Sequence, residues 1–74
     1  MIEKRFKLKR KYIVMVQFII EGYEGMATVT TIEPQTAIIK ISIIPDFLAD
    51  MSDLINYLKN KYEMEEISIS AIKQ

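Results

Sequence analysis

The apolar residues of this chain recur with two different periods, and the order of these periods is the feature that most restricts the fold. Four segments have the apolar pattern of strands, either at alternate positions or nearly throughout: 2–9, 26–32, 37–44 and 67–71. Segment 47–62 has apolar residues at steps of three and four, as an amphipathic helix does. Pro45 ends the preceding strand, and Asp46 is the predicted N-cap of this helix.

The segment from Tyr12 to Glu24 is ambiguous, because it is rich in β-branched residues that favour a strand. Its polar side chains are Gln17, Glu21 and Glu24, spaced i, i+4 and i+7, which places them on one stripe of a helix. We therefore expect a helix, closed by a left-handed residue at Gly25, with a strand as the alternative.

The resulting order is strand, helix, strand, strand, helix, strand. This order predicts an α+β, ferredoxin-like split βαβ fold (βαββαβ): a four-stranded antiparallel sheet with two helices on one face. The first and third strands would be central, and residues 1–74 would form a single domain. If Tyr12 to Ile20 is a strand instead, the alternative is a β-meander plus one helix and a last strand.

The composition excludes several classes of function. With no His and no Cys, the chain lacks the commonest general base, the commonest metal ligand and any thiolate nucleophile. We therefore expect a protein that is not an enzyme and that has no cofactor and no metal site. The apolar run Tyr12 to Ile20 is too short to cross a membrane as a helix, and Glu-Gly-Tyr-Glu-Gly follows where a signal peptide would have small residues. These features predict a protein that is neither secreted nor inserted in a membrane.

Charge is distributed unevenly along the sequence. Residues 1–11 carry six basic side chains and one acidic side chain, whereas the remainder is acidic. On the predicted sheet, three lysines would line the face that the helices leave open: Lys7, Lys9 and Lys40. Such a face suits nucleic acid or an acidic partner, although a strand charged only for solubility is the alternative. A reader of single-stranded RNA is disfavoured, because the third strand has no aromatic residue.

Two further sets of residues are candidates for binding. Glu21, Tyr23 and Glu24 place two carboxylates and a phenol near one helix end, as a ligand-binding site or as a merely solvated surface. The strand 26–32 has no charge and no Pro, so its edge could pair with a second copy of itself through Met26, Thr28, Thr30 and Ile32. We therefore expect a homodimer.

The run from Phe18 to Thr31, followed by Pro34, an Ile-rich strand and Pro45, is similar to the short bacterial proteins grouped as domain of unknown function family 4911. Its most specific part is Glu-Gly-Tyr-Glu-Gly at 21–25, and the similarity covers about Tyr12 to Ile67. The resemblance implies a stand-alone cytoplasmic bacterial protein and transfers no activity.

The family resemblance and the residue patterns together leave two hypotheses for the function. The first is a non-enzymatic, regulatory-type module that binds a ligand or a protein and works as a homodimer. The alternative is an accessory protein that holds nucleic acid or an acidic partner on the basic first strand and the open sheet face.

Overall fold

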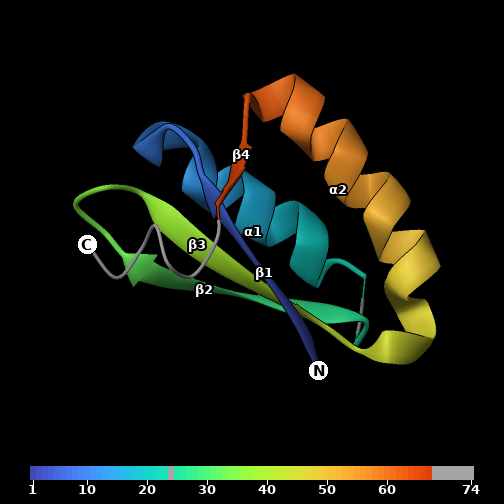
Figure 1. Ribbon diagram of the computed structural model, residues 1–74. Coiled ribbons are helices and arrows are strands. Elements are labelled where there is room, and N and C mark those ends of the chain that lie inside the picture. Colours follow the sequence, from blue (N-terminus) through green and yellow to red (C-terminus); the bar gives the residue numbers. More distant parts are fainter. Residues whose placement is uncertain (24, 68–74) are drawn as a thin grey trace.

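The strands and helices follow one another in the order that the sequence predicts (Figure 1). A computed structural model describes residues 1–23 and 25–67. The elements are β1 (Ile2–Lys7), α1 (Ile13–Glu21), β2 (Ala27–Glu33), β3 (Ile38–Ile43), α2 (Leu48–Tyr62) and β4 (Glu65–Ile67). Short 3-10 helices, Arg10–Tyr12 and Pro45–Phe47, lead into α1 and α2. The strands form one antiparallel sheet in the order β2-β3-β1-β4, so the ferredoxin-like prediction is confirmed and the meander is excluded.

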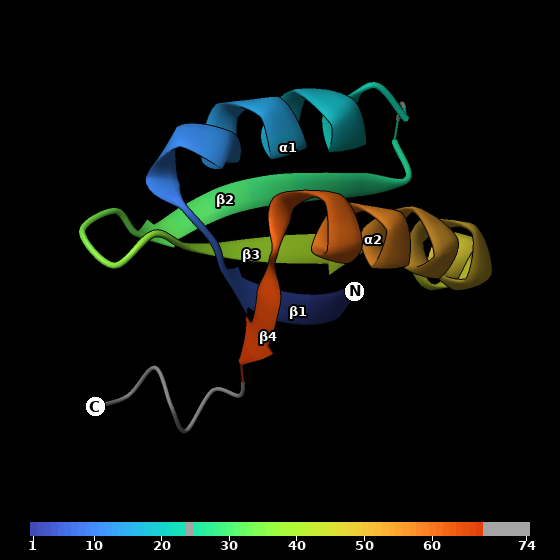
Figure 2. The same ribbon diagram turned by 90° about the horizontal axis from the view of Figure 1, so that it is seen from above.

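One face of the sheet holds the core, and both helices pack on it (Figure 2). Phe6 of β1 lies opposite Ile39, and Val29 of β2 lies opposite Ile41, so alternate residues of neighbouring strands point to the same side. These side chains are buried, and they share one cluster with residues of both helices: Val16, Ile20, Met51, Ile55 and Leu58. Burial of each such large side chain stabilises the fold by about 1.5–3 kcal/mol.

The segment with the ambiguous pattern is a helix, as expected. Ile13, Val16 and Ile20 lie on one side of α1 and are buried, so packing overrides the strand preference of its β-branched residues. The predicted end of this helix was wrong. α1 ends at Glu21, and Gly22 caps it in a right-handed conformation, with its N–H donating to the Phe18 carbonyl. Gly25 does adopt a positive φ of 75°, but it does so in the loop that follows.

The boundaries of α2 also differ from the prediction. Asp46 lies inside the 3-10 helix, and among the described residues no side chain caps α2, whose N-cap is Phe47. Pro45 begins the turn instead, because its fixed φ suits a first helical position. At the other end Glu63 takes a left-handed conformation with φ 55°, and the Met64 N–H donates to the Lys59 carbonyl.

Two predicted strand boundaries were also wrong. β3 begins at Ile38 because Ala37 has a φ of 58° and belongs to the turn. β4 begins at Glu65 rather than at Ile67, and positions 68–71 of the predicted last strand lie outside the described residues. Within the described part of the chain, no helix is long and apolar enough to cross a membrane.

Candidate functional site

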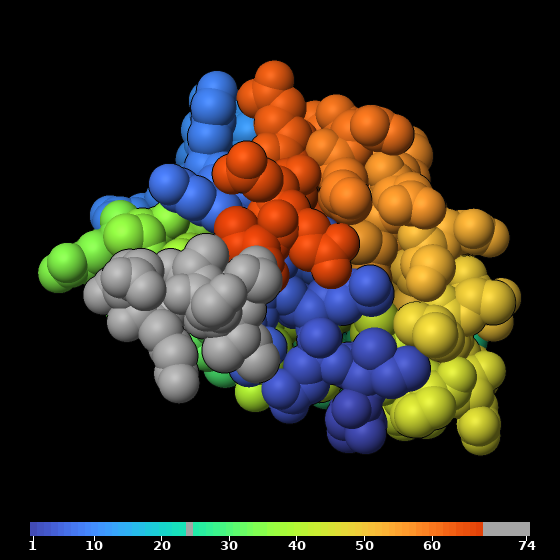
Figure 3. Space-filling view, in the orientation of Figure 1, coloured from blue at the N-terminus to red at the C-terminus, as the bar shows by residue number. Residues whose placement is uncertain are grey.

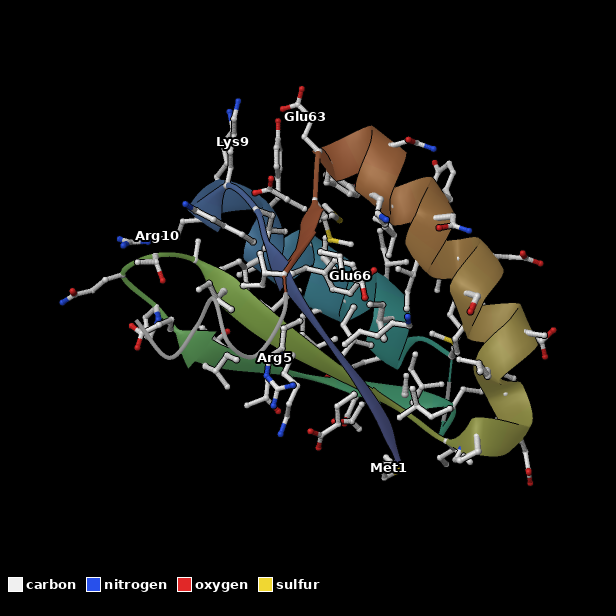
Figure 4. All side chains as sticks on the ribbon, viewed as in Figure 1. Met1, Arg5, Lys9, Arg10, Glu63 and Glu66 are labelled. Carbon is white, nitrogen blue, oxygen red and sulfur yellow. The ribbon has the colours of Figure 1, made fainter. Side chains whose placement is uncertain are left out.

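The open face of the sheet carries basic residues, but an acid lies among them. Glu3 on β1 forms ion pairs with two basic side chains of this face. Its Oε1 lies 3.4 Å from Arg5 Nη2, and its Oε2 lies 3.5 Å from Lys40 Nζ. Figure 4 shows Arg5 pointing away from the two helices. Because Glu3 offsets the charge of its neighbours, the cationic character of this face is weaker than the sequence pattern indicates.

The three predicted lysines do not form one patch. Lys7 is exposed on the open face, opposite Ile38 of β3. Lys9 lies beyond the end of β1 and its Nζ is 3.8 Å from Glu63 Oε1, at the end of α2 (Figure 4). The prediction that Lys9 lines the open face was therefore wrong, since the chain leaves the sheet after Lys7. The geometry gives the basic-face hypothesis no added support.

The predicted acidic site lies at the end of α1. Glu21 is the last residue of the helix and is exposed, and its Oε2 accepts a hydrogen bond from Gln17 Nε2 at 3.4 Å. Tyr23 follows in the loop, where its carbonyl accepts the Met26 N–H. Glu24 lies outside the described residues. No group of three or more metal-ligating side chains occurs among the residues that the structure describes.

On the helix side of the sheet, another ion pair joins β1 to β4. Lys4 shares the inward phase of β1 with Phe6, and its Nζ lies 3.6 Å from Glu66 Oε2. Together with Ser52, Asn56 and Lys59 of α2, this pair borders a small hollow of about 140 Å³. Figure 3 shows this side of the molecule, with β1 in dark blue between β4 in red-orange and the beginning of α2 in yellow.

The outer flank of α1 is an apolar surface that our reading of the sequence missed. Val14 and Phe18, one turn apart, are 76% and 75% exposed, which makes them the most exposed large apolar side chains among the described residues. The signal was present in the sequence. Between Ile13 and Ile20 only Gln17 is polar, so α1 has more apolar residues than its single buried face can cover.

This flank lies beside the edge strand of the sheet. Arg10, Ile13 and Val14 line one side of an open hollow of about 350 Å³, and the other side is formed by Thr31, Pro34 and Gln35 from the end of β2 and the following turn. Figure 2 shows α1 running along β2, at the outer side of the sheet. The exposed apolar flank and the edge of β2 therefore belong to one continuous surface, which we call the α1–β2 surface.

The free backbone groups of this edge can be assigned. The Met26 carbonyl accepts the Ile44 N–H at 3.0 Å, so this carbonyl, and by alternation the backbone groups of Thr28 and Thr30, point toward β3. The backbone groups of Ala27, Val29 and Thr31 then point outward. Of the predicted edge residues, Thr28 and Thr30 direct exposed side chains to the open face, Met26 precedes β2, and Ile32 lies in a β-bulge.

Comparison with known proteins adds one match. No curated protein and no solved structure matches the chain significantly. The model of one family, described as "Domain of unknown function (DUF4911)", matches residues 6–61, which include the end of β1, all of α1, β2 and β3, and nearly all of α2. The chain therefore belongs to the DUF4911 family.

Proposed function

We propose that this chain is a non-enzymatic binding module that works as a homodimer, joined through the α1–β2 surface. The observation that carries the proposal is the position of Val14 and Phe18, which expose apolar side chains next to an edge strand without charge or Pro in its central part. An exposed apolar patch and an unprotected edge each favour association, and here they are adjacent.

A second copy satisfies both features at once. Antiparallel pairing of β2 with β2 of the partner would join two four-stranded sheets into one of eight strands, and α1 would pack against α1 of the partner. The outward backbone groups of Val29 and Thr31 would gain hydrogen bonds, while Val14 and Phe18 would leave water. A domain of this size gains in particular from such burial, because it covers only about 60% of the surface that its unfolded chain exposes.

The dimer, rather than the single chain, is the binding unit in this proposal. The hollow between Arg10 and Thr31 opens toward the α1–β2 surface, so a second copy would enclose it and give a small ligand an apolar wall with one guanidinium at the rim. This arrangement supports a regulatory-type module in which ligand binding and subunit association are coupled.

Analytical ultracentrifugation of the full chain tests the homodimer. We expect a species of twice the 8.6 kDa chain mass. Phe18→Asp and Thr31→Pro should each give monomers that keep the circular dichroism spectrum of the fold, because Phe18 is exposed in the single chain and the Thr31 N–H lies outside the β2–β3 ladder. Tyr57→Asp is the matched control. Tyr57 is 55% exposed on α2, so this variant should remain dimeric.

The proposal fails if the wild-type chain is monomeric at every soluble concentration, or if Tyr57→Asp dissociates the dimer as readily as Phe18→Asp does. Native mass spectrometry of gently purified protein addresses the ligand. Retained extra mass on the dimer that is lost in Thr31→Pro would support binding at the hollow, and retention by the monomeric variant would place the ligand elsewhere.

A further inference from the structure

We propose that Arg10 and Glu21 form an ion pair across the interface, so that the α1–β2 surface recognises a second copy of itself in one antiparallel register. The inference rests on the proposed homodimer and names what makes the contact specific. It follows from the arrangement of charge along the outer flank of α1.

Two charged side chains flank two apolar ones along this side of α1. Arg10, Val14 and Glu21 are separated by four and seven residues, and Phe18 lies one turn beyond Val14, so these side chains follow one side of the helical segment 10–21. The base lies at the N-terminal end, the acid at the C-terminal end, and the exposed apolar pair lies between them.

This arrangement of charges is complementary to a second, antiparallel copy of itself. A two-fold axis places two copies of α1 side by side and antiparallel, so the N-terminal end of each helix meets the C-terminal end of the other. Arg10 of each chain then faces Glu21 of the other, and Val14 faces the Phe18 region of the other. A parallel arrangement would instead place like charges together. It would also set the two helix dipoles side by side in the same direction, which is unfavourable.

The two-fold axis that pairs the α1 helices also brings the β2 edges of the two chains together. The N-terminal end of α1 lies next to Thr31 and Pro34, while the loop after its C-terminal end returns to the start of β2 through the bond from Met26 N–H to the Tyr23 carbonyl. The midpoint of segment 10–21 therefore lies over the middle of β2, near Thr30. An axis at that point sets Val29 opposite Thr31 of the partner, and these residues carry outward backbone groups.

Each charged group has a weak contact that the dimer would replace. Arg10 Nη2 donates to the Gln35 carbonyl at 3.2 Å, and Gln17 Nε2 donates to Glu21 Oε2 at 3.4 Å. Both contacts are exposed, and exposed polar contacts of this kind stabilise a fold very little. Figure 4 shows Arg10 directed away from the body of the molecule, where a partner could reach it.

Charge reversal tests the pairing. Arg10→Glu and Glu21→Arg should each raise the dimer dissociation constant about tenfold or more, because each creates two like-charge contacts per dimer. The double variant Arg10→Glu with Glu21→Arg restores opposite charges and should return the constant to near the wild-type value. Lys61→Glu and Asp53→Arg are controls on exposed positions of α2 and should leave the constant unchanged.

A mixing experiment makes the test independent of the double variant. Arg10→Glu chains carry two acids on the flank, and Glu21→Arg chains carry two bases, so each should dimerise weakly alone and the mixture should form heterodimers in preference. A mixture of Lys61→Glu and Asp53→Arg chains has the same net charges, and its heterodimers should not exceed the statistical share. This control separates the specific pair from general attraction between oppositely charged chains.

The outcomes distinguish the two proposals. A wild-type chain that is monomeric contradicts the homodimer and the ion pair together. A wild-type dimer whose double variant is no tighter than either single variant, and whose two single variants do not form heterodimers, overturns the ion pair alone. Restoration in the double variant, or selective heterodimers in the mixture, establishes the antiparallel register.

Discussion

Lys4 occupies a position where the pattern of β1 calls for an apolar side chain. It faces the helices in line with Phe6, and the Glu66 carboxylate lies near its ammonium group. The side chain is 32% exposed, so the ammonium group reaches water past the rim of the hollow while the stem covers apolar surface.

This geometry predicts that Lys4→Met is tolerated. A half-exposed ion pair contributes about 0–1 kcal/mol, and a methionine would pack against Phe6 and Ile55 at the same place. The free energy of unfolding, measured in urea, should stay within about 1 kcal/mol of the wild-type value. Phe6→Ala provides the contrast, with an expected loss of about 3–5 kcal/mol from a fully buried site. A comparable loss in Lys4→Met would show that the ion pair is essential to the fold.

The end of α2 is strained at a single residue. Glu63 adopts the left-handed conformation that glycine adopts at little cost, and its contact with Lys9 is exposed. Glu63→Gly should therefore raise the free energy of unfolding by about 0.5–1 kcal/mol, because removal of the side chain relieves strain of about 1–2 kcal/mol and adds some backbone entropy to the unfolded chain.

Thermal or urea unfolding measures this change. Asp53→Gly is the matched control, since the same replacement in the exposed middle of α2 should cost about 1 kcal/mol. If both replacements destabilise the chain equally, the left-handed conformation of Glu63 carries no strain.

The elements themselves were predictable from the sequence, but their ends were not. The polar stripe of Gln17 and Glu21 correctly indicated a helix against local propensity, because the period of burial depends on packing. Gly25 and Asp46 misled the prediction of helix ends, since the geometry of a loop depends on where the chain must go next. Ala37 likewise takes a turn conformation that no pattern of apolar residues reveals.

The candidate sites, too, were only partly predictable from the sequence. The edge position of β2 followed from topology and is confirmed, whereas its outward backbone groups required the register with β3. Lys9 was misplaced, because β1 ends at Lys7 and the chain then turns toward α1. The exposed flank of α1 was overlooked because its apolar residues resemble those of a core until the buried face is known.

At the scale of the whole molecule, the proposed dimer couples stability to concentration. If folding and association are linked, the melting temperature of the wild-type chain should rise by several degrees for each tenfold increase in protein concentration. Thr31→Pro should melt at a temperature independent of concentration, because it lacks the shared sheet. Differential scanning calorimetry over a range of concentrations measures both, and a constant wild-type melting temperature would contradict the linkage.

The central position of β1 has a consequence for how the chain is made. β1 lies between β3 and β4, and both are synthesised after it, so the first of the four strands to be made is held only when much later segments have emerged from the ribosome. During that interval its apolar phase, Ile2 and Phe6, is exposed to water. The basic residues interleaved with them, Arg5 and Lys7 among them, keep the waiting strand soluble and oppose its pairing with other nascent chains.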